Sequence, residues 1–196
     1  MITSDSLRQT PRDLRPLTVP RPAMGELRLR PTMRGNGFVV GSVDANGPDT
    51  VGFANRDRVA WRDTSIELPE LILLSQDDVL GVPSWVTDQQ VVDFLGPGLV
   101  ARALMRSNHP VGRGDDVRVI STDPLVSEMA TAWARHLGAH IVAEGPALVL
   151  EHSDRGRVLP QAHGRLAQAA VDVFQAIRAG MFADIDAAQP RTITAA

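Results

Sequence analysis

The chain has 196 residues, of which 43% are hydrophobic and 22% charged, as in folded globular proteins. Its 20 basic residues are all arginines, its net charge is −3, and it contains no cysteine and no tyrosine. This composition excludes lysine Schiff bases, thiolate nucleophiles, cysteine-bound zinc and a basic surface for nucleic acid. The sequence shows no signal peptide and no apolar run long enough to cross a bilayer, so we expect a cytoplasmic protein without membrane contact.

The first part of the chain predicts an extended segment followed by a β-rich lobe. Residues 1–24 contain four prolines and several charges, which favours an extended N-terminal segment. Short β-rich runs separated by Gly, Pro, Asn and Asp then indicate a compact lobe with connecting helices over residues 25–110. The expected strands are residues 26–30, 37–43, 58–61 and 67–74.

The periodicity becomes helical after Pro83. Thr87 is followed by polar residues and then by apolar ones, which predicts a helix capped by Thr87. A separate helical stretch is expected over residues 98–105, beyond Pro97.

The second part predicts a parallel β–α–β unit within a lobe over residues 111–185. The helix of this unit ends at Gly138, and the next amphipathic helix ends at Gly180. Residues 186–196 are expected to form a flexible tail. In chain order the expected elements are a strand at 116–120, a helix at 124–137, strands at 139–143 and 147–151, and a helix at 166–179.

Six segments, taken in order, resemble the zinc-free quinone oxidoreductase and enoyl reductase branch of the medium-chain dehydrogenase/reductase superfamily. They are residues 19–27, 33–43, 51–59, 112–119, 132–142 and 166–180. Residues 51–59 (VGFANRDRV), for example, resemble the family segment that ends in F-x-x-G-D-R-V, with Arg56 where glycine is usual. The resemblance implies an α/β (α+β) fold, in which a GroES-like β-rich lobe is joined to a reduced Rossmann-like lobe with a parallel sheet.

Two parts of the family pattern are absent from the sequence. A helical loop that helps to form the family's substrate cleft is absent between Arg30 and Met33, and most of the Rossmann domain is absent between Val142 and Gly156. The phosphate-binding glycines of that domain are also missing. At their place, residues 121–129 contain no glycine and add Asp123 and Glu128, whose charges repel a diphosphate. We therefore expect no nicotinamide cofactor.

Candidate functional residues follow from the same resemblance and from residue chemistry. His109 lies in the segment that joins the lobes in the family, and Asp44 and Asp123 follow strands, so these three are the candidate catalytic groups. Trp61 and Trp85 flank the expected cleft and are the candidate substrate-binding residues. His109 also has a structural interpretation as a loop residue, Asp123 as a helix cap, and the two tryptophans as core packing. The five histidines are scattered and no cysteine is present, so we expect no metal.

Two classes of function remain open. The first is a redox-inactive enzyme that acts without cofactor on a small apolar carbonyl compound, as a cyclase, isomerase or dehydratase in polyketide-like biosynthesis. The second is a non-catalytic assembly protein that pairs with itself, as a homodimer, or with a full-length relative. An atypical NAD(P)H-dependent reductase is a further alternative.

Overall fold

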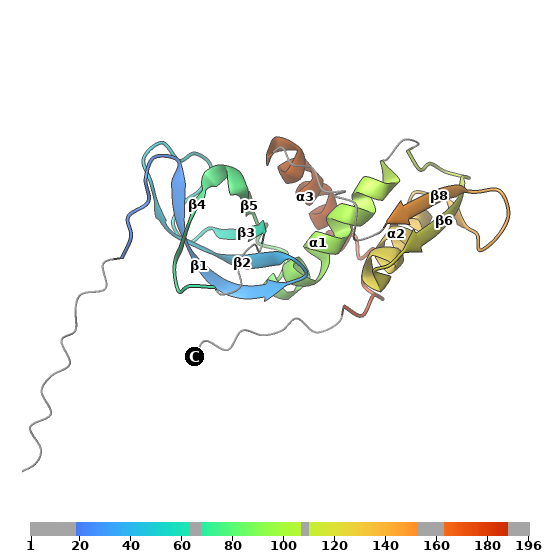
Figure 1. Cartoon of the computed structure of the whole chain (residues 1–196), viewed down its shortest axis with the longest axis horizontal. Coiled ribbons are helices and arrows are strands. Elements are labelled where there is room, and N and C mark those ends of the chain that lie inside the picture. Colours follow the sequence, from blue (N-terminus) through green and yellow to red (C-terminus); the bar gives the residue numbers. More distant parts are fainter. Residues whose placement is uncertain (1–18, 63–67, 107–109, 153–162, 188–196) are drawn as a thin grey trace, which may run out of the picture.

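The computed structural model contains two lobes of different sheet type with helices between them (Figure 1). It describes residues 19–62, 68–106, 110–152 and 163–187. The expected α/β architecture, an antiparallel lobe joined to a smaller parallel one, is confirmed. Most of the segments predicted as an extended N-terminus and a flexible tail lie outside the described residues, and the predicted domain boundaries stay predictions.

The first lobe is a five-stranded antiparallel sheet with the strand order β4-β1-β2-β3-β5. The β1–β2 hairpin turns at Asn36 and Gly37, both with positive φ, as a two-residue turn of this sequence requires. The last strand, β5, was not expected from the sequence, because it has three residues and depends on pairing with β3. The strands are β1 Glu26–Gly35, β2 Phe38–Asn46, β3 Arg58–Arg62, β4 Ile72–Ser75 and β5 Val79–Gly81.

Helix α1, Asp88–Met105, connects the two lobes. Its predicted cap is confirmed, since the Thr87 side chain accepts from the Gln90 N–H and the Gln90 side chain accepts from the Thr87 N–H. The prediction of two separate helical stretches is wrong, because α1 runs through Pro97 without a break.

A residue from the other lobe explains why α1 continues through its proline. Pro97 has no N–H for the Asp93 carbonyl oxygen four residues earlier. That oxygen accepts instead from Asn36 Nδ2, at 2.9 Å. The hairpin tip also lies directly against the helix, where a Cβ at Gly96 would come within 2.2 Å of the Asn36 carbonyl oxygen. The tip of the first sheet therefore docks on α1 at its proline.

The second lobe is a three-stranded parallel sheet with the order β7-β6-β8. The expected β–α–β unit is present, and its helix ends before Gly138, which has a φ of 86°. The final helix packs on α1 rather than on this sheet. The elements are β6 Asp116–Ser121, α2 Pro124–His136, β7 His140–Ile141, β8 Leu148–His152 and α3 His163–Arg178.

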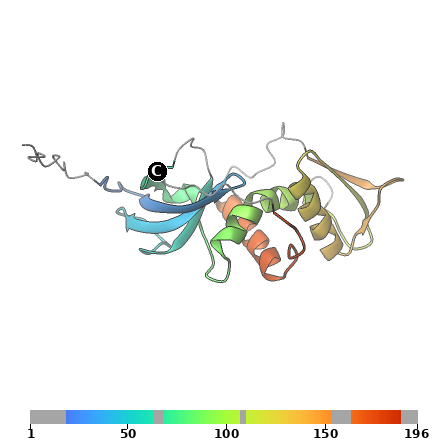
Figure 2. The same ribbon diagram turned by 90° about the horizontal axis from the view of Figure 1, so that it is seen from below.

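One hydrophobic core runs from the inner face of the first sheet through the three helices to the parallel sheet. Figure 2 shows α2 on the inner side of the parallel sheet, toward α1, and none of the described helices on the outer side. Ile120 and Val149 point to that outer side and are 47% and 45% exposed. No helix among the described residues is long and apolar enough to span a membrane.

Candidate functional site

The strand order of the parallel sheet reverses at β6, its central strand. The chain passes from β6 through α2 to β7 on one side of β6, and β8 lies on the other side. In open parallel sheets, ligands bind outside the carboxyl ends of the strands at such a switch point. The carboxyl ends of β6 and β8 are therefore the candidate site.

Two polar side chains meet at these carboxyl ends. Ser121 ends β6, His152 ends β8, and the parallel register pairs them directly. The Ser121 Oγ lies 3.1 Å from His152 Nδ1. His152 is one of two buried polar residues in the described part of the chain, with 8% of its surface exposed. A histidine side chain held by a hydrogen bond at a switch point is a candidate for acid–base chemistry.

The hydrogen bonds around Ser121 bear on the orientation of the His152 ring. The Ser121 hydroxyl donates its one proton to the Asp123 carbonyl oxygen at 2.9 Å. The Oγ must then accept from its other neighbours, which are the Asp123 N–H at 3.1 Å and the His152 ring. With the Ser121 proton on the Asp123 carbonyl, this arrangement matches the His152 tautomer that has its N–H at Nδ1.

In the loop after β6, the carboxylate of Asp123 caps the N-terminus of α2. Asp123 Oδ1 accepts from the Leu125 N–H at 2.9 Å and from the Val126 N–H at 3.3 Å. Pro124 occupies the first helical position and has no N–H. A dinucleotide of the kind that the fold family binds needs these N–H groups for its diphosphate, together with glycines that let the backbone approach. The residues present do not fit that cofactor.

The residues proposed from sequence lie apart from this pair, except Asp123. Asp44 is on β2 and forms an ion pair with Arg28, with Oδ2 2.7 Å from Nε. The hydrogen bond from Arg28 lowers the pKa of Asp44 below its ordinary value. His109 lies outside the described residues. The structure thus gives Asp44 an ion-pairing role within the first lobe and Asp123 a capping role in α2.

The two candidate tryptophans occupy different environments. Trp61 is 2% exposed and packs in a second core cluster within the first lobe. Trp85 precedes α1, is 40% exposed, and stacks under the guanidinium of Arg178, 5.3 Å from the ring centroid. Of the two, Trp85 is the one whose ring faces solvent.

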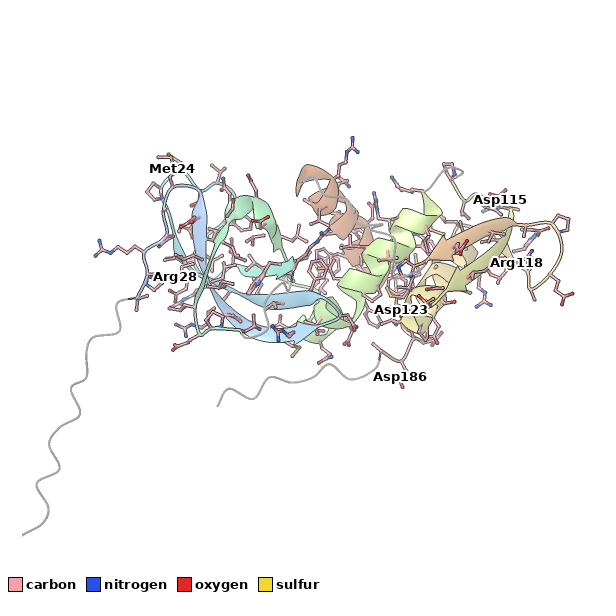
Figure 3. The ribbon with its side chains drawn as sticks, viewed as in Figure 1. Met24, Arg28, Asp115, Arg118, Asp123 and Asp186 are labelled. Atoms are coloured by element: carbon pink, nitrogen blue, oxygen red, sulfur yellow. The ribbon has the colours of Figure 1, made fainter. Side chains whose placement is uncertain are left out.

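The Ser121–His152 pair was not among the candidates from sequence. His152 follows a short apolar run, and nothing in that run distinguishes it from the other histidines. The one available signal was that each residue ends a parallel strand, which places both at the same edge of the sheet. Figure 3 labels Asp123, just after the carboxyl end of β6, and Asp115, just before its amino end.

No family model matches the sequence, and no curated protein matches it. Among solved structures, Escherichia coli quinone oxidoreductase complexed with NADPH is similar with a TM-score of 0.67 and 14% identity, over 87% of this chain and 85% of that chain. A mycobacterial protein complexed with NADPH is 26% identical, with a TM-score of 0.52, over 69% of this chain and 53% of that one. The CurF ER cyclopropanase from the curacin A biosynthetic pathway is 15% identical, with a TM-score of 0.55, over 63% and 47%.

These likenesses confirm the fold that the sequence resemblance predicted. The chain has a shortened form of the medium-chain dehydrogenase/reductase fold, with a GroES-like lobe and a Rossmann-like lobe. It spans about half the length of the mycobacterial protein and of the cyclopropanase. Identities this low show the fold and leave the chemistry to be argued from the site.

Proposed function

We propose that this chain is a redox-inactive derivative of the quinone oxidoreductase fold that binds a small apolar carbonyl compound and moves a proton on it without a nucleotide. The reaction class is cyclisation, isomerisation or dehydration in specialised, polyketide-like metabolism. The observation that carries the proposal is the Asp123 carboxylate at the N-terminus of α2, where a diphosphate would have to bind.

The Asp123 cap argues against hydride transfer on two physical grounds. Its carboxylate uses two of the N–H groups that attract an anion at a helix N-terminus, and its negative charge repels a phosphate brought close to it. Asp123 would have to leave its hydrogen bonds before a dinucleotide entered, at a cost of about 1 kcal/mol for the lost cap.

The Ser121–His152 pair supplies the proposed chemistry. An imidazole whose orientation is fixed through Nδ1 presents Nε2 as a base, and the imidazolium it becomes returns the proton as an acid. Abstraction of a proton next to a carbonyl group and its return at another carbon is an isomerisation and consumes no cofactor. The names of two structural neighbours are consistent with this substrate class, since a quinone is a conjugated dicarbonyl compound and a cyclopropanase forms a ring.

The first experiment is a calorimetric titration of the whole chain with NADPH and with NADH. We expect no binding at about 1 mM cofactor, because the N-terminus of α2 is already capped. Micromolar binding would refute the redox-inactive assignment, and the protein would then be assayed as an NAD(P)H-dependent reductase.

The second experiment tests the proton transfer. The protein is incubated in D2O with 2-cyclohexen-1-one, and exchange of the protons next to the carbonyl is followed by NMR. His152→Asn retains an N–H in place of Nδ1–H for Ser121 but has no Nε2, so we expect exchange to fall to the uncatalysed rate. The matched control is His140→Asn, because His140 is exposed at the amino end of the sheet. Equal exchange rates in the two variants would contradict the assignment.

A second candidate function, assembly with another copy of this chain, rests on the outer face of the parallel sheet. Parallel sheets are normally covered on both faces, yet here Ile120 and Val149 are about half exposed. The register places Arg118 beside Val149 and Ile120 beside Glu151. A twofold axis that runs along the line from Ile120 to Val149 would bring the arginine of one copy toward the glutamate of the other, with the apolar side chains between them.

Light scattering coupled to gel filtration tests this assembly. We expect a homodimer that becomes monomeric in the variant Ile120→Glu and stays dimeric in Val171→Glu, a matched change at an exposed valine on α3. A wild-type chain that is monomeric at about 100 µM, far above the Kd of a stable dimer, contradicts self-assembly. In that case, the remaining form of the assembly function is pairing with a full-length relative.

A further inference from the structure

A pocket of about 780 Å³ lies away from the candidate site, between the C-terminal parts of the three helices. It is lined by Arg102 and Arg106 of α1, by Trp133 near the end of α2, and by Asp172 of α3. α2 starts at the carboxyl edge of the parallel sheet and ends at the pocket, so its 13 residues separate the two sites by roughly 20 Å. This pocket is therefore separate from the candidate site.

The charges in the pocket do not balance. Arg102 Nε lies 2.6 Å from Asp172 Oδ2, and Arg106 lies 3.6 Å from the same oxygen. Asp172 is the one carboxylate among the described residues that line the pocket. Two guanidinium groups thus share a single carboxylate, and one positive charge is left over.

The excess charge resides on Arg106. The Arg102 side chain is 13% exposed and holds the closer bond to Asp172, while the Arg106 side chain is 66% exposed. A guanidinium offers five N–H donors, and the 3.6 Å approach to Asp172 is too long for a good hydrogen bond. Arg106 is therefore free to bind an anion with paired hydrogen bonds.

The remaining wall of the pocket is mainly apolar. Met105, Val111, Trp133 and Ala176 line it, and each is at most 9% exposed. The volume lies within the range of small-molecule sites, and a flat tryptophan next to a methionine accommodates an alkyl chain or ring. A ligand that satisfies both parts of the pocket has an apolar body and one carboxylate.

We propose that this pocket binds an apolar monocarboxylate, such as a medium-chain fatty acid, with its carboxylate on Arg106 and its hydrocarbon chain along Trp133. Neither the fold nor the proposed proton-transfer site requires this pocket. The ion pair between Arg102 and Asp172 joins α1 to α3 and has a structural role by itself, whereas Arg106 makes a longer contact with Asp172 and is mostly exposed.

The experiment compares octanoate with 1-octanol, which has the same chain and no charge, by calorimetry on the whole protein. We expect octanoate to bind at least about tenfold more tightly than octanol, because a charge-assisted pair is lost in the alcohol. Arg106→Gln should remove that difference and leave octanol unaffected. Asp172→Asn should tighten octanoate binding severalfold, because it releases both guanidinium groups.

The controls distinguish the pocket from general charge effects. Arg178→Gln removes an exposed arginine of α3 that stacks on Trp85 and does not line the pocket, so octanoate binding should not change. Octanoate should also change the tryptophan fluorescence, and Trp133→Phe should abolish that change. The proposal is overturned if octanoate does not bind, if octanol binds equally well, or if Arg106→Gln leaves octanoate affinity as it was in a variant with unchanged circular dichroism.

Discussion

The contact between the hairpin tip and Pro97 gives the sharpest test of how the lobes are held together. Asn36→Gly keeps a residue that accepts the positive φ of the turn but removes the Nδ2 that donates to the Asp93 carbonyl. That carbonyl belongs to a residue that is 8% exposed, and Pro97 supplies no N–H in its place. A buried acceptor left without a donor costs about 1–3 kcal/mol.

Urea unfolding and thermal unfolding, each followed by circular dichroism, measure this cost. For a chain of this length each kcal/mol corresponds to a fall in Tm of about 2–4 °C, so Asn36→Gly should lower Tm by roughly 2–12 °C. In a Pro97→Ala background the helix supplies its own N–H to the Asp93 oxygen, and the same substitution should cost less than about 0.5 kcal/mol.

A double-mutant cycle tests whether the Asn36 side chain replaces the helix N–H that Pro97 lacks. A coupling free energy of about 1–2 kcal/mol between Asn36 and Pro97 is expected. If Asn36→Gly costs the same with proline and with alanine at position 97, the side chain does not replace the missing helix donor, and the explanation for the unbroken α1 is wrong.

Three further predictions concern single carboxylates. Asp123→Ala should lower the free energy of unfolding by about 1 kcal/mol, because two helix N–H groups lose their acceptor, and Asp123→Asn should lower it by less than half of that. Burial raises the pKa of Asp93, so folding penalises its charged form. Asp93→Asn should therefore be more stable than the wild type at pH 7, and the difference should shrink as the pH falls through the raised pKa toward the unfolded value of about 3.9. The hydrogen bond from Arg28 lowers the pKa of Asp44, so Asp44→Asn should lose at most about 1 kcal/mol at neutral pH, and this loss should vanish as the pH falls through the lowered pKa.

Urea unfolding at a series of pH values tests all three predictions. Two glycine substitutions, one at a crowded position and one at an open position, give reference values for the loss of stability. Gly96→Ala should be severely destabilising, since its Cβ would lie 2.2 Å from the Asn36 carbonyl oxygen. Gly81→Ala meets nothing within 4 Å and should be nearly neutral. A pH-independent difference for Asp93→Asn, or a neutral Gly96→Ala, would contradict the packing described above.

Local chemistry made many of the elements predictable from sequence. Asn36-Gly37 is a hairpin turn by itself, Thr87 and Gln90 cap a helix within four residues, and Gly138 ends one. The order of strand, helix and strand after residue 115 predicts a β–α–β unit, in which the two strands are parallel. Each of these signals is contained in a few neighbouring residues.

Contacts between distant residues produced the features that the sequence did not reveal. β5 exists because three residues pair with β3, and α1 continues through Pro97 because Asn36 lies against it. Neither partner is close enough in the sequence to act as a local signal. The sequence predicted two helical stretches on either side of Pro97, and in the structure a tertiary hydrogen bond supports one continuous helix.

The missing phosphate-binding glycines, the absence of cysteine and lysine, and the order of the six family-like segments are properties of the sequence alone, because each depends on which residues are present. The partnership of Ser121 with His152 depends on the parallel register of β6 and β8, which joins residues 31 positions apart. The unmatched charge on Arg106 likewise depends on two helices that place Arg102 and Asp172 together across 70 positions. Side chains so far apart meet only after the core has formed, and the tertiary structure therefore decided both proposed sites.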